Sequence, residues 1–351
     1  MTIKEFREQS LALFAKAERI AITSHMSPDD DSIGSVLAAR EFLVTRYPQK
    51  EVRIIYTGTP VSRYAVFDDF DGIEWVDDIT HHVAGIELLL VLDVSHLGRV
   101  SKSEDLSSLR SIPTIVSIDH HKTAPDEATT LAYIDPSLTS NAELFYRVFE
   151  TELALTKKLA SYILCGVLGD TGNFSFVPPE QASSVFSLAS RLVETAGVGI
   201  DQFRSQYGGI PKSILPLLQQ LVANTAYKEV PGWPTVQYSW IDRTTVESGQ
   251  FTDEDMSAAS HIYIGQYLPR VEGQTWGFVA TPRSDGGVRV SGRSLPGSVN
   301  VRDMFERMGI GGGHDRASGA NFPAVKGEPM ESSVAVEKLF VWMRDNLPLL
   351  G

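Results

Sequence analysis

One stretch, residues 20–35, constrains the fold of this chain more than any other, because an apolar run there ends abruptly in acidic residues. Residues 20–24 have the composition of a buried strand, and Pro28 prevents that strand from continuing. Residues 33–47 then carry apolar side chains at helical spacing. The stretch therefore predicts a strand-to-helix turn, which is where α/β proteins bind ligands.

The acidic residues of this turn indicate a metal site. Asp29, Asp30 and Asp31 are consecutive, and packed carboxylates repel one another unless a cation neutralises them. His25, just before them, adds an imidazole, which borderline metals accept as a ligand. The simpler alternative is a solvated acidic loop in which an Asp or Ser caps the following helix.

The N-terminal part of the chain alternates between predicted strands and helices. Further strands are expected at residues 52–58, 87–94, 114–121 and 131–135, and helices at 140–154, 156–169 and 180–196. Strands that are almost wholly apolar are buried on both faces, and their alternation with helices predicts a doubly wound, mostly parallel α/β sheet with helices on both faces.

A change of composition marks the end of this domain, because residues 197–211 are rich in glycine. Beyond it we expect a smaller α+β domain, in which two strands form a hairpin across Ser-Asp-Gly-Gly. Its strands are predicted at 235–241, 274–280 and 287–293, and its helices at 299–308 and 331–346. The predicted division is a metal-binding domain at 1–195, a linker and connecting helix at 196–225, and a substrate-binding domain at 226–351.

Apolar elements that end in ionisable residues recur in the first domain, at Asp93, at Asp119-His120-His121 and at Asp170. The carboxyl ends of parallel strands lie along one edge of a sheet, so we expect these groups to converge with those of residues 25–31. Taken singly, each could be a turn residue or a satisfied core histidine. Their repetition favours a shared site.

The expected ligand set is too large for a single ion. Four or five carboxylates with one or two imidazoles suit two ions bridged by one Asp, and oxygen-rich ligation favours Mn²⁺ or Mg²⁺ over zinc. Cys165 is the only cysteine, which excludes cysteine-based zinc or iron–sulfur sites. Paired ions serve hydrolytic displacement at phosphorus, and the motifs of nucleotide kinases, dinucleotide-binding dehydrogenases and serine hydrolases are absent.

The second domain carries its own anion-binding signal in the glycine-rich segment 309–319. Gly312 and Gly313 would let backbone N–H groups approach an anion, and His314 and Arg316 bring further donors. A flexible turn is the alternative explanation.

Two arginines upstream strengthen the anion-binding interpretation. Arg289 and Arg293 are four residues apart on one predicted strand and so point to the same face. A guanidinium on that face can bind phosphate through two hydrogen bonds.

The overall charge limits the classes of molecule that the protein is expected to bind. The formal net charge is −13 and no cluster of Lys and Arg stands out, which argues against long nucleic acid as the main partner. No apolar run approaches 18 residues and no signal-peptide core is present, so we expect a cytoplasmic protein that does not bind membranes.

With these motifs in order, the chain resembles the DHH phosphoesterases, in particular the standalone two-domain type with a DHH-associated C-terminal domain. The motifs that carry the resemblance are His25-Met-Ser-Pro-Asp29-Asp-Asp31-Ser-Ile-Gly-Ser, Leu92-Asp93-Val, Asp119-His120-His121, Gly169-Asp170-Thr-Gly, and Gly311-Gly-Gly-His314 followed by Ala317-Ser-Gly. Asp30 departs from the pattern where glycine is usual, and Ala124 where asparagine is usual.

The resemblance implies a role for each residue of the first domain. One Mn²⁺ would be held by His25, Asp29 and Asp93, and the other by Asp31, Asp93, His120 and Asp170, with Asp93 as the bridge. His121 would contact the scissile phosphate, and Asp119 would orient the histidines. Mg²⁺ or Co²⁺ could substitute for Mn²⁺.

The resemblance also implies the substrates. We expect a phosphoesterase that degrades short oligonucleotides to mononucleotides and dephosphorylates 3′-phosphoadenosine 5′-phosphate (pAp). A phosphodiesterase for cyclic di-AMP or its linear product pApA is the alternative, and a catalytically silent nucleotide-binding regulator is disfavoured because every expected ligand is present. The sequence leaves open whether the chain forms a homodimer and whether the N-terminal helix at 2–18 packs on its own domain.

Overall fold

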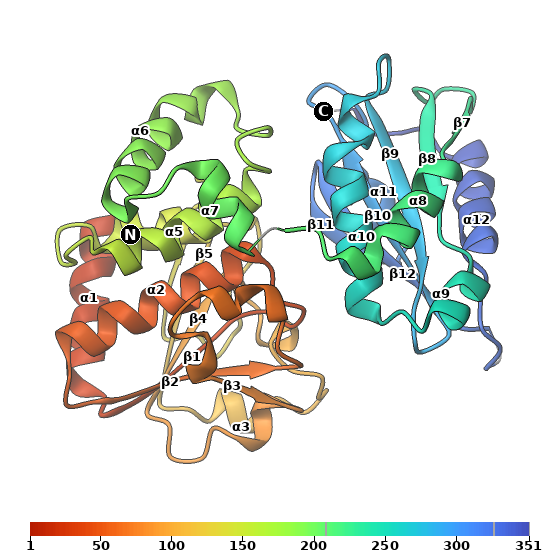
Figure 1. The fold of residues 1–351 in the computed structure, drawn as a ribbon. Helices are drawn as coiled ribbons and strands as arrows, with labels where there is room; N and C mark the ends of the chain where they lie inside the picture. The colour runs from red at the N-terminus through yellow and green to blue at the C-terminus, as the bar shows by residue number, and fades with distance from the viewer. Residues whose placement is uncertain (208, 326, 351) are drawn as a thin grey trace. The chain divides into compact units, whose positions relative to one another are not determined.

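The computed structural model describes residues 1–207, 209–325 and 327–350 and divides into two compact units, Met1–Gly209 and Ile210–Gly351 (Figure 1). The division falls within the segment 196–225 that was predicted to connect the domains. Among the described residues, no helix has both the length and the apolar character that a membrane span requires.

The first unit is built on the predicted parallel sheet. Its six strands are all parallel and lie in the order β3-β2-β1-β4-β5-β6. They are β1 (Arg19–Thr23), β2 (Glu51–Thr57), β3 (Ile73–Val76), β4 (Leu88–Leu92), β5 (Thr114–Asp119) and β6 (Leu131–Ile134). Only β3 was not expected, because it is four residues long and includes polar Glu74.

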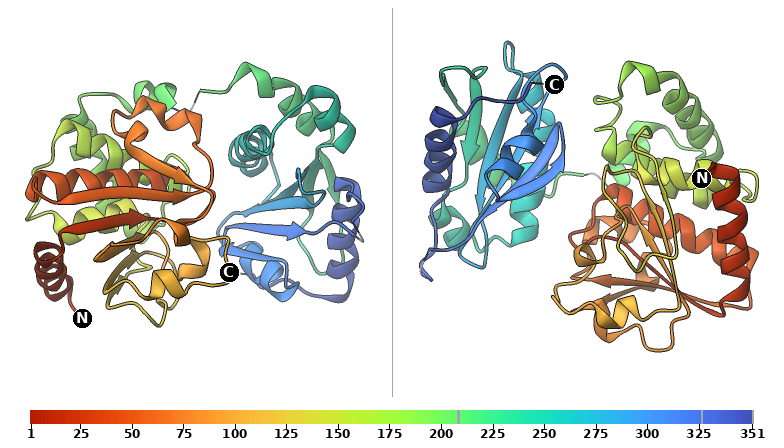
Figure 2. Two further views of the ribbon diagram at one scale, coloured as in Figure 1. Left: turned by 90° about the horizontal axis from the view of Figure 1, so that it is seen from below. Right: turned by 180° about the vertical axis from the view of Figure 1, so that it is seen from behind.

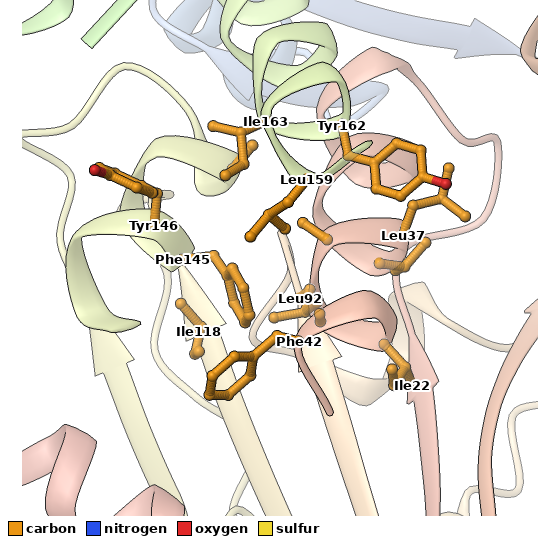
Figure 3. Close-up of a cluster of buried hydrophobic side chains, with 14 of the residues drawn as sticks. Ile22, Leu37, Phe42, Leu92, Ile118, Phe145, Tyr146, Leu159, Tyr162 and Ile163 are labelled. Atoms are coloured by element: carbon orange, nitrogen blue, oxygen red, sulfur yellow. The ribbon is translucent and has the colours of Figure 1, made fainter. Parts of the chain in front are cut away.

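Most helices of the first unit share one hydrophobic core with one face of this sheet. They are α1 (Ile3–Lys16), α2 (Asp30–Arg46), α4 (Asn141–Phe149), α5 (Lys157–Asp170) and α6 (Pro179–Ala196), with α7 (Ile200–Tyr207) following. Figure 3 shows part of the resulting core, in which Ile22, Leu92 and Ile118 of neighbouring strands belong to the same cluster as Phe42 and Phe145. Helices and strands thus alternate as the sequence predicted.

The opposite face differs from the expectation of helices on both sides. It is covered by the four-residue helix α3 (Ser107–Arg110), by short 3₁₀ turns and by loops. The Ser-rich segment 101–108 favours turns over a long helix, since Ser side chains compete for backbone hydrogen bonds. The N-terminal helix α1 packs on its own unit, because Phe6 and Phe14 are fully buried in the same core as the sheet.

Two glycines let α2 and α5 pack in close contact. A Cβ atom at Gly34 would lie 2.5 Å from the carbonyl oxygen of Tyr162 and 2.9 Å from the amide nitrogen of Gly166. A Cβ atom at Gly166 would lie 2.5 Å from Asp31 Oδ1. The same glycines that allow the two helices to approach therefore also make room for an acidic residue of the predicted metal site.

The second unit contains a mixed sheet in the order β11-β12-β10-β9-β8-β7, in which only β8 and β9 are parallel neighbours. The strands are β7 (Ala226–Lys228), β8 (Val236–Trp240), β9 (Trp276–Pro282), β10 (Val288–Ser294), β11 (Gly311–His314) and β12 (Ala317–Phe322). The predicted β9–β10 hairpin is confirmed, with Pro282 paired to Val288.

Helices lie on both faces of this second sheet (Figures 1 and 2). One face packs against α11 (Val301–Arg307) and α12 (Ser332–Asp345), and the other packs against α8 (Leu215–Ala223) and α10 (Asp253–Gln266), with α9 (Arg243–Gly249) beyond β8. The buried residues on the second of these faces come from β9, through Val279, and not from β10. Helix α10 also lies against β10 on this face.

The glycine-rich segment does not form a flexible turn. Residues 311–314 form the edge strand β11, which pairs with β12. A Cβ atom at Gly311 would lie 2.0 Å from the carbonyl oxygen of Gly319, so the close pairing requires glycine there. Gly313 has φ 144°, a conformation that strongly favours glycine. The segment is thus an ordered strand with an exposed backbone edge.

Asp78 stabilises the loops at the carboxyl end of the first sheet. Its buried carboxylate accepts hydrogen bonds from Thr80, from Ser101 and from the backbone N–H groups of Lys102 and Ser103. Burial alone would raise the pKa of this carboxyl group, but the hydrogen bonds from Thr80, Ser101 and Lys102 outweigh it and lower the pKa to about 2. The ionised form is therefore the one that the fold favours.

Replacing Asp78 by Asn should lower the free energy of unfolding at pH 7 by roughly 2 kcal/mol. Because the pKa is lowered on folding, this stabilisation is complete above about pH 4, the region of the unfolded pKa, and is lost as the pH falls through about 2. Urea unfolding of both proteins at several pH values measures it. Glu8→Gln, which removes a surface ion pair with Lys4 at 3.9 Å, is the control and should change stability little. A pH-independent difference between wild type and Asp78→Asn would contradict the charge argument.

Candidate metal centre

The predicted site residues lie where the strand order of the first sheet reverses. Strand β1 has β2 on one side and β4 on the other, so the connections leave in opposite directions and open a crevice at the carboxyl ends of β1 and β4. His25 follows β1, Asp93 follows β4, and Asp119 is the last residue of β5. The topology therefore brings together groups that are far apart in the sequence.

A first cluster forms around His25. Its Nε2 atom lies 3.2 Å from Asp93 Oδ2 and 3.5 Å from Asp29 Oδ2. Asp29 is the N-cap of α2, and its carboxylate accepts a hydrogen bond from the backbone N–H of Ser32 at 2.9 Å. The helix start thus fixes the position of one carboxylate of the cluster.

A second cluster forms around His120. Its Nε2 atom lies 3.1 Å from Asp170 Oδ2, 3.4 Å from Asp93 Oδ1 and 3.7 Å from Asp31 Oδ2. In each cluster one ligand atom per residue can be chosen so that all lie within 4.8 Å of one another, for His25, Asp29 and Asp93 in the first and for Asp31, His120 and Asp170 in the second. Asp93 directs one oxygen toward each histidine and so connects the two clusters.

Backbone carbonyl groups set the tautomer of both histidines. His25 Nδ1 lies 3.0 Å from the carbonyl oxygen of Met26, and His120 Nδ1 lies 3.3 Å from that of Leu138. A carbonyl oxygen only accepts, so Nδ1 carries the proton in each ring. Nε2 is then the atom presented to the carboxylates, as in histidines that bind a metal. Sequence analysis did not predict these two carbonyl contacts.

Asp31 is held by the start of another helix. Its Oδ2 accepts a hydrogen bond from the backbone N–H of Asn141 at 2.5 Å, and its Oδ1 accepts one from Ala142 at 2.9 Å. Both amides belong to the first turn of α4, whose N–H groups have no partner within the helix. Asp31 is fully buried, so this contact fixes it firmly. Sequence analysis missed it, because the partners are 110 residues apart.

Asp119 contacts His121 through both the ring and the backbone of that histidine. Asp119 Oδ1 lies 2.7 Å from His121 Nδ1 and also accepts the backbone N–H of His121 at 3.0 Å. Its other oxygen accepts from Ser95 Oγ at 2.5 Å and from Thr123 Oγ1 at 3.1 Å. Ala124 is exposed, and Thr123 provides the hydrogen bond from this loop to Asp119.

Burial and the neighbouring charges shift the pKa values of the clustered carboxyl groups. Burial and the neighbouring charges of Asp93 and Asp170 raise the pKa of Asp31 well above its usual range, and burial also raises that of Asp170. Burial opposes the ionisation of Asp93 too, but the imidazoles of His120 and His25 hold its pKa well below the usual range. Burial would also raise the pKa of Asp29, but the charge of His25 outweighs it and lowers that pKa to about 2.

The neighbouring carboxylates raise the pKa values of His25 and His120. Burial alone would lower the pKa of His25, but Asp29 and Asp93 outweigh it and raise that pKa well above the usual range. For His120, Asp170 and Asp93 likewise outweigh burial. Without another cation, protons on the imidazoles balance the carboxylates. A divalent ion would replace those protons.

The donor atoms fit a divalent metal. Asp93 Oδ1 is buried and accepts no hydrogen bond from any of the residues that the structure describes, although a buried carboxylate oxygen normally has a partner. Carboxylate oxygens and imidazole Nε2 atoms are the ligands of divalent first-row metals. Asp93 also has φ 59°, a strained backbone conformation of the kind that functional sites retain. The chemistry and geometry of these residues therefore fit a divalent-metal centre.

The predicted anion-binding residues of the second unit lie mainly on β10 and β11, which are separated in the sheet by β12. The burial pattern of β10 places Arg289 and Arg293 on the face opposite its buried valines, as predicted. Arg289 pairs in register with Asn321 of β12, and its side chain lies over Gly319.

The rest of the predicted set lies at the sheet edge. Gly312, Gly313 and His314 belong to the edge strand β11. Arg316 Nη1 donates to the carbonyl oxygens of Ser298 and Val299, so its guanidinium supports the backbone of the adjacent loop.

Comparisons with known proteins agree with the motifs. Residues 19–167 match the model of the DHH family, N-terminal domain. The chain is 27% identical over 315 residues to the probable bifunctional oligoribonuclease and PAP phosphatase NrnA of Streptococcus mutans, across 89% of this chain and 92% of that protein. It is also 27% identical over 319 residues to the cyclic-di-AMP phosphodiesterase GdpP of Geobacillus thermodenitrificans, across 86% of this chain but 44% of that protein.

A solved structure supports the same fold. The exopolyphosphatase-related protein from Bacteroides fragilis superposes with a TM-score of 0.77 at 20% identity, covering 97% of each chain. The family match covers the segment that supplies all but one of the clustered residues, and Asp170 follows it directly. The segment 19–167 therefore matches the DHH family, in agreement with the motifs of the first unit.

Proposed function

We propose that this protein is a manganese-dependent phosphoesterase that degrades short oligoribonucleotides to mononucleotides and also dephosphorylates pAp. The observation that carries the proposal is the pair of histidine–carboxylate clusters joined through Asp93. Two clusters around one shared carboxylate suit two ions, which is the arrangement that hydrolyses phosphoesters in other enzymes. The similarity to NrnA over nearly the whole chain supports the choice of substrate.

Each cluster would hold one Mn²⁺. His25, Asp29 and Asp93 would bind the first ion, and the second would be bound by Asp31, Asp93, His120 and Asp170. When bound, such ions lower the pKa of a water molecule and stabilise negative charge on phosphoryl oxygens. The protein's own part is to hold these ligands in place before the substrate arrives, which the N-cap of α2 and the first turn of α4 do for Asp29 and Asp31.

His121 would contact the phosphate group that is cleaved. Its Nδ1 atom lies 2.7 Å from Asp119 Oδ1, and this contact fixes the orientation of the imidazole ring. Asp119 remains ionised in this role, because hydrogen bonds from His121 and Ser95 offset the effect of burial and lower its pKa.

The second unit would select the substrate. Metal ions bind phosphate but do not distinguish one nucleotide from another, whereas Arg289 and Arg293 place two guanidinium groups on one strand face. The edge strand β11 adds backbone N–H groups beside them. We therefore assign the metal chemistry to the first unit and recognition of a second phosphate to the second.

Replacing Arg289 by Ala should raise KM and lower kcat/KM by roughly tenfold to 150-fold, the value of one charge-assisted phosphate contact. Manganese content should not change, since Arg289 belongs to the other compact unit. Steady-state kinetics on pAp and on a dinucleotide, with metal analysis of the same preparations, measure both effects. Arg344→Ala, which removes a surface pair with Glu337, is the control. Wild-type kinetics in the Arg289 variant would show that Arg289 does not bind the substrate.

Hydrolysis of cyclic di-AMP or pApA is the second candidate, because the chain is also similar to GdpP. We rank it lower because the chain covers less than half of that protein but nearly all of NrnA. Both reactions are phosphodiester hydrolysis and need the same metal centre, so the substrate alone distinguishes them.

Product analysis of the manganese-loaded protein on pAp, pApA, a pentamer, a 24-mer and cyclic di-AMP tests the proposal. With a net charge of −13, affinity must come from a few local phosphate contacts, so kcat/KM should fall as the substrate lengthens. Equal kcat/KM on a dinucleotide and a 24-mer would refute the preference for short substrates. Faster turnover of cyclic di-AMP than of every linear substrate would select the second candidate.

A further inference from the structure

Asp30 lies between the predicted ligands Asp29 and Asp31, but its side chain belongs to neither metal cluster. Asp30 Oδ1 accepts hydrogen bonds from Arg63 Nη2 at 2.7 Å and from the Tyr64 hydroxyl at 2.6 Å. The Asp30 side chain is only 14% exposed. The chain has therefore placed a third, nearly buried negative charge beside the metal centre and supplied it with its own partners.

The two partners come from a single short turn. Arg63 and Tyr64 belong to the 3₁₀ helix η1 (Ser62–Val66), which follows β2. The Arg63 guanidinium also contacts the Tyr64 hydroxyl and lies 4.7 Å from the centroid of its ring. Tyr64 is fully buried, so it holds the guanidinium in one orientation.

Asp30 is also packed against the backbone that leads to the second cluster. A Cβ atom at Gly169 would lie 2.4 Å from Asp30 Cβ and 3.2 Å from Asp30 Oδ2. Gly169 immediately precedes Asp170. The Asp30 side chain thus lies against the backbone of the residue before Asp170, and its own backbone adjoins the ligands Asp29 and Asp31.

Contacts other than those of Arg63 keep the η1 region folded. The rings of Phe67 and Tyr162 meet edge to face at 5.5 Å. Asp69 pairs with Lys158 at 2.6 Å and accepts a hydrogen bond from the Tyr162 hydroxyl at 3.0 Å. Loss of the Arg63 charge should therefore leave this region in place.

An uncompensated carboxylate at position 30 would have two opposite effects. It would attract divalent cations more strongly, and it would repel the phosphate group of the substrate. Arg63 supplies the one positive charge that pairs with Asp30 among the described residues.

We propose that Arg63 is a positioning residue that neutralises Asp30 and holds it away from the ions, so that the metal centre keeps its affinity for phosphate. This inference rests on the proposed metal-dependent phosphoesterase function. It concerns a residue outside the ligand set and accounts for a carboxylate at a position where the DHH pattern usually has glycine.

A double-mutant cycle with Arg63→Gln and Asp30→Asn tests the proposal. Calorimetric titration of the metal-free protein gives the affinity for Mn²⁺, and titration of the manganese-loaded protein gives the affinity for inorganic phosphate. In Arg63→Gln we expect Mn²⁺ to bind more tightly and phosphate to bind about tenfold more weakly, with KM rising in parallel. In the double variant both affinities should return to within about threefold of wild type, because no unpaired charge remains.

Opposite shifts of the two affinities distinguish charge balance from damage to the structure, which would weaken both. Arg53→Gln is the matched control, because it breaks an Arg–carboxylate pair with Glu74 in the same unit, on strands β2 and β3. It should leave both affinities unchanged. A double variant as impaired as Arg63→Gln alone, or wild-type affinities in Arg63→Gln, would overturn the proposal. If none of the nucleotide substrates is hydrolysed but the two titrations behave as expected, the proposed substrate fails and the role of Arg63 stands.

Discussion

Asp93→Asn should lower kcat/KM by about 10³-fold or more and weaken the binding of both metal ions. Asp93 is the one carboxylate whose two oxygens face different histidines, His25 at 3.2 Å and His120 at 3.4 Å. An amide can offer one oxygen but not two, and it carries no negative charge. Loss of a bridging ligand removes several kcal/mol of charge stabilisation, which corresponds to a rate effect of this size.

Asn is the appropriate substitution because the backbone at residue 93 has φ 59°. Among residues other than glycine, Asn and Asp adopt this conformation most readily, so the variant should fold normally. Manganese titration and kinetics on pAp measure the two effects. Asp105→Asn, an exposed loop carboxylate that caps Ser107, is the control. An Asp93→Asn protein that still binds two ions with wild-type affinity would show that Asp93 is not the bridge.

Gly166→Ala should both destabilise the protein and damage the metal centre. The added Cβ would lie 2.5 Å from Asp31 Oδ1 and 2.5 Å from Ala142 Cβ, distances that require the neighbours to move. Overpacking of this kind costs about 1–3 kcal/mol. Displacement of Asp31 from the amides of α4 should weaken metal binding by about 10–100-fold, as for other changes to the support of a ligand.

Two further glycine substitutions separate these effects. Gly34→Ala also crowds α2 against α5, but its Cβ would meet backbone atoms of Tyr162 and Gly166 and not Asp31. It should lower the free energy of unfolding with a smaller loss of metal affinity. Gly265→Ala in α10 has no atom within 4 Å of the new Cβ and should be neutral or slightly stabilising. Thermal unfolding with and without Mn²⁺ measures all three. Unchanged metal affinity in Gly166→Ala would contradict the proposed support of Asp31.

Much of the metal centre could be predicted because each ligand follows an apolar element. Strand composition located β1, β4 and β5, and topology then required their carboxyl ends to converge. The same reasoning identified the β9–β10 hairpin from Ser-Asp-Gly-Gly and the common face of Arg289 and Arg293 from their spacing. These are local patterns that a single sequence contains.

What could not be predicted depends on contacts between distant residues. The amides of α4 that hold Asp31, the carbonyl groups of Met26 and Leu138 that set the tautomers, and the pairing of Asp30 with Arg63 have no local signature. The sequence did not predict that residues 311–314 form a strand, because glycine has low strand propensity. Their pairing with β12 depends on the missing Cβ atom of Gly311, which would lie 2.0 Å from the carbonyl oxygen of Gly319.

The placement of Asp170 has a consequence for how the protein responds to its metal. Asp29 is the N-cap of α2, where the macrodipole of a helix favours negative charge, but Asp170 is the last residue of α5, where the macrodipole opposes it. The three residues 172–174 that follow all have positive φ. The end of α5 is thus the least favourable part of the centre in the absence of cations, and metal binding stabilises it most. Ion binding and the ordering of this helix end should therefore be coupled, so that chelation increases hydrogen exchange there before it affects the start of α2.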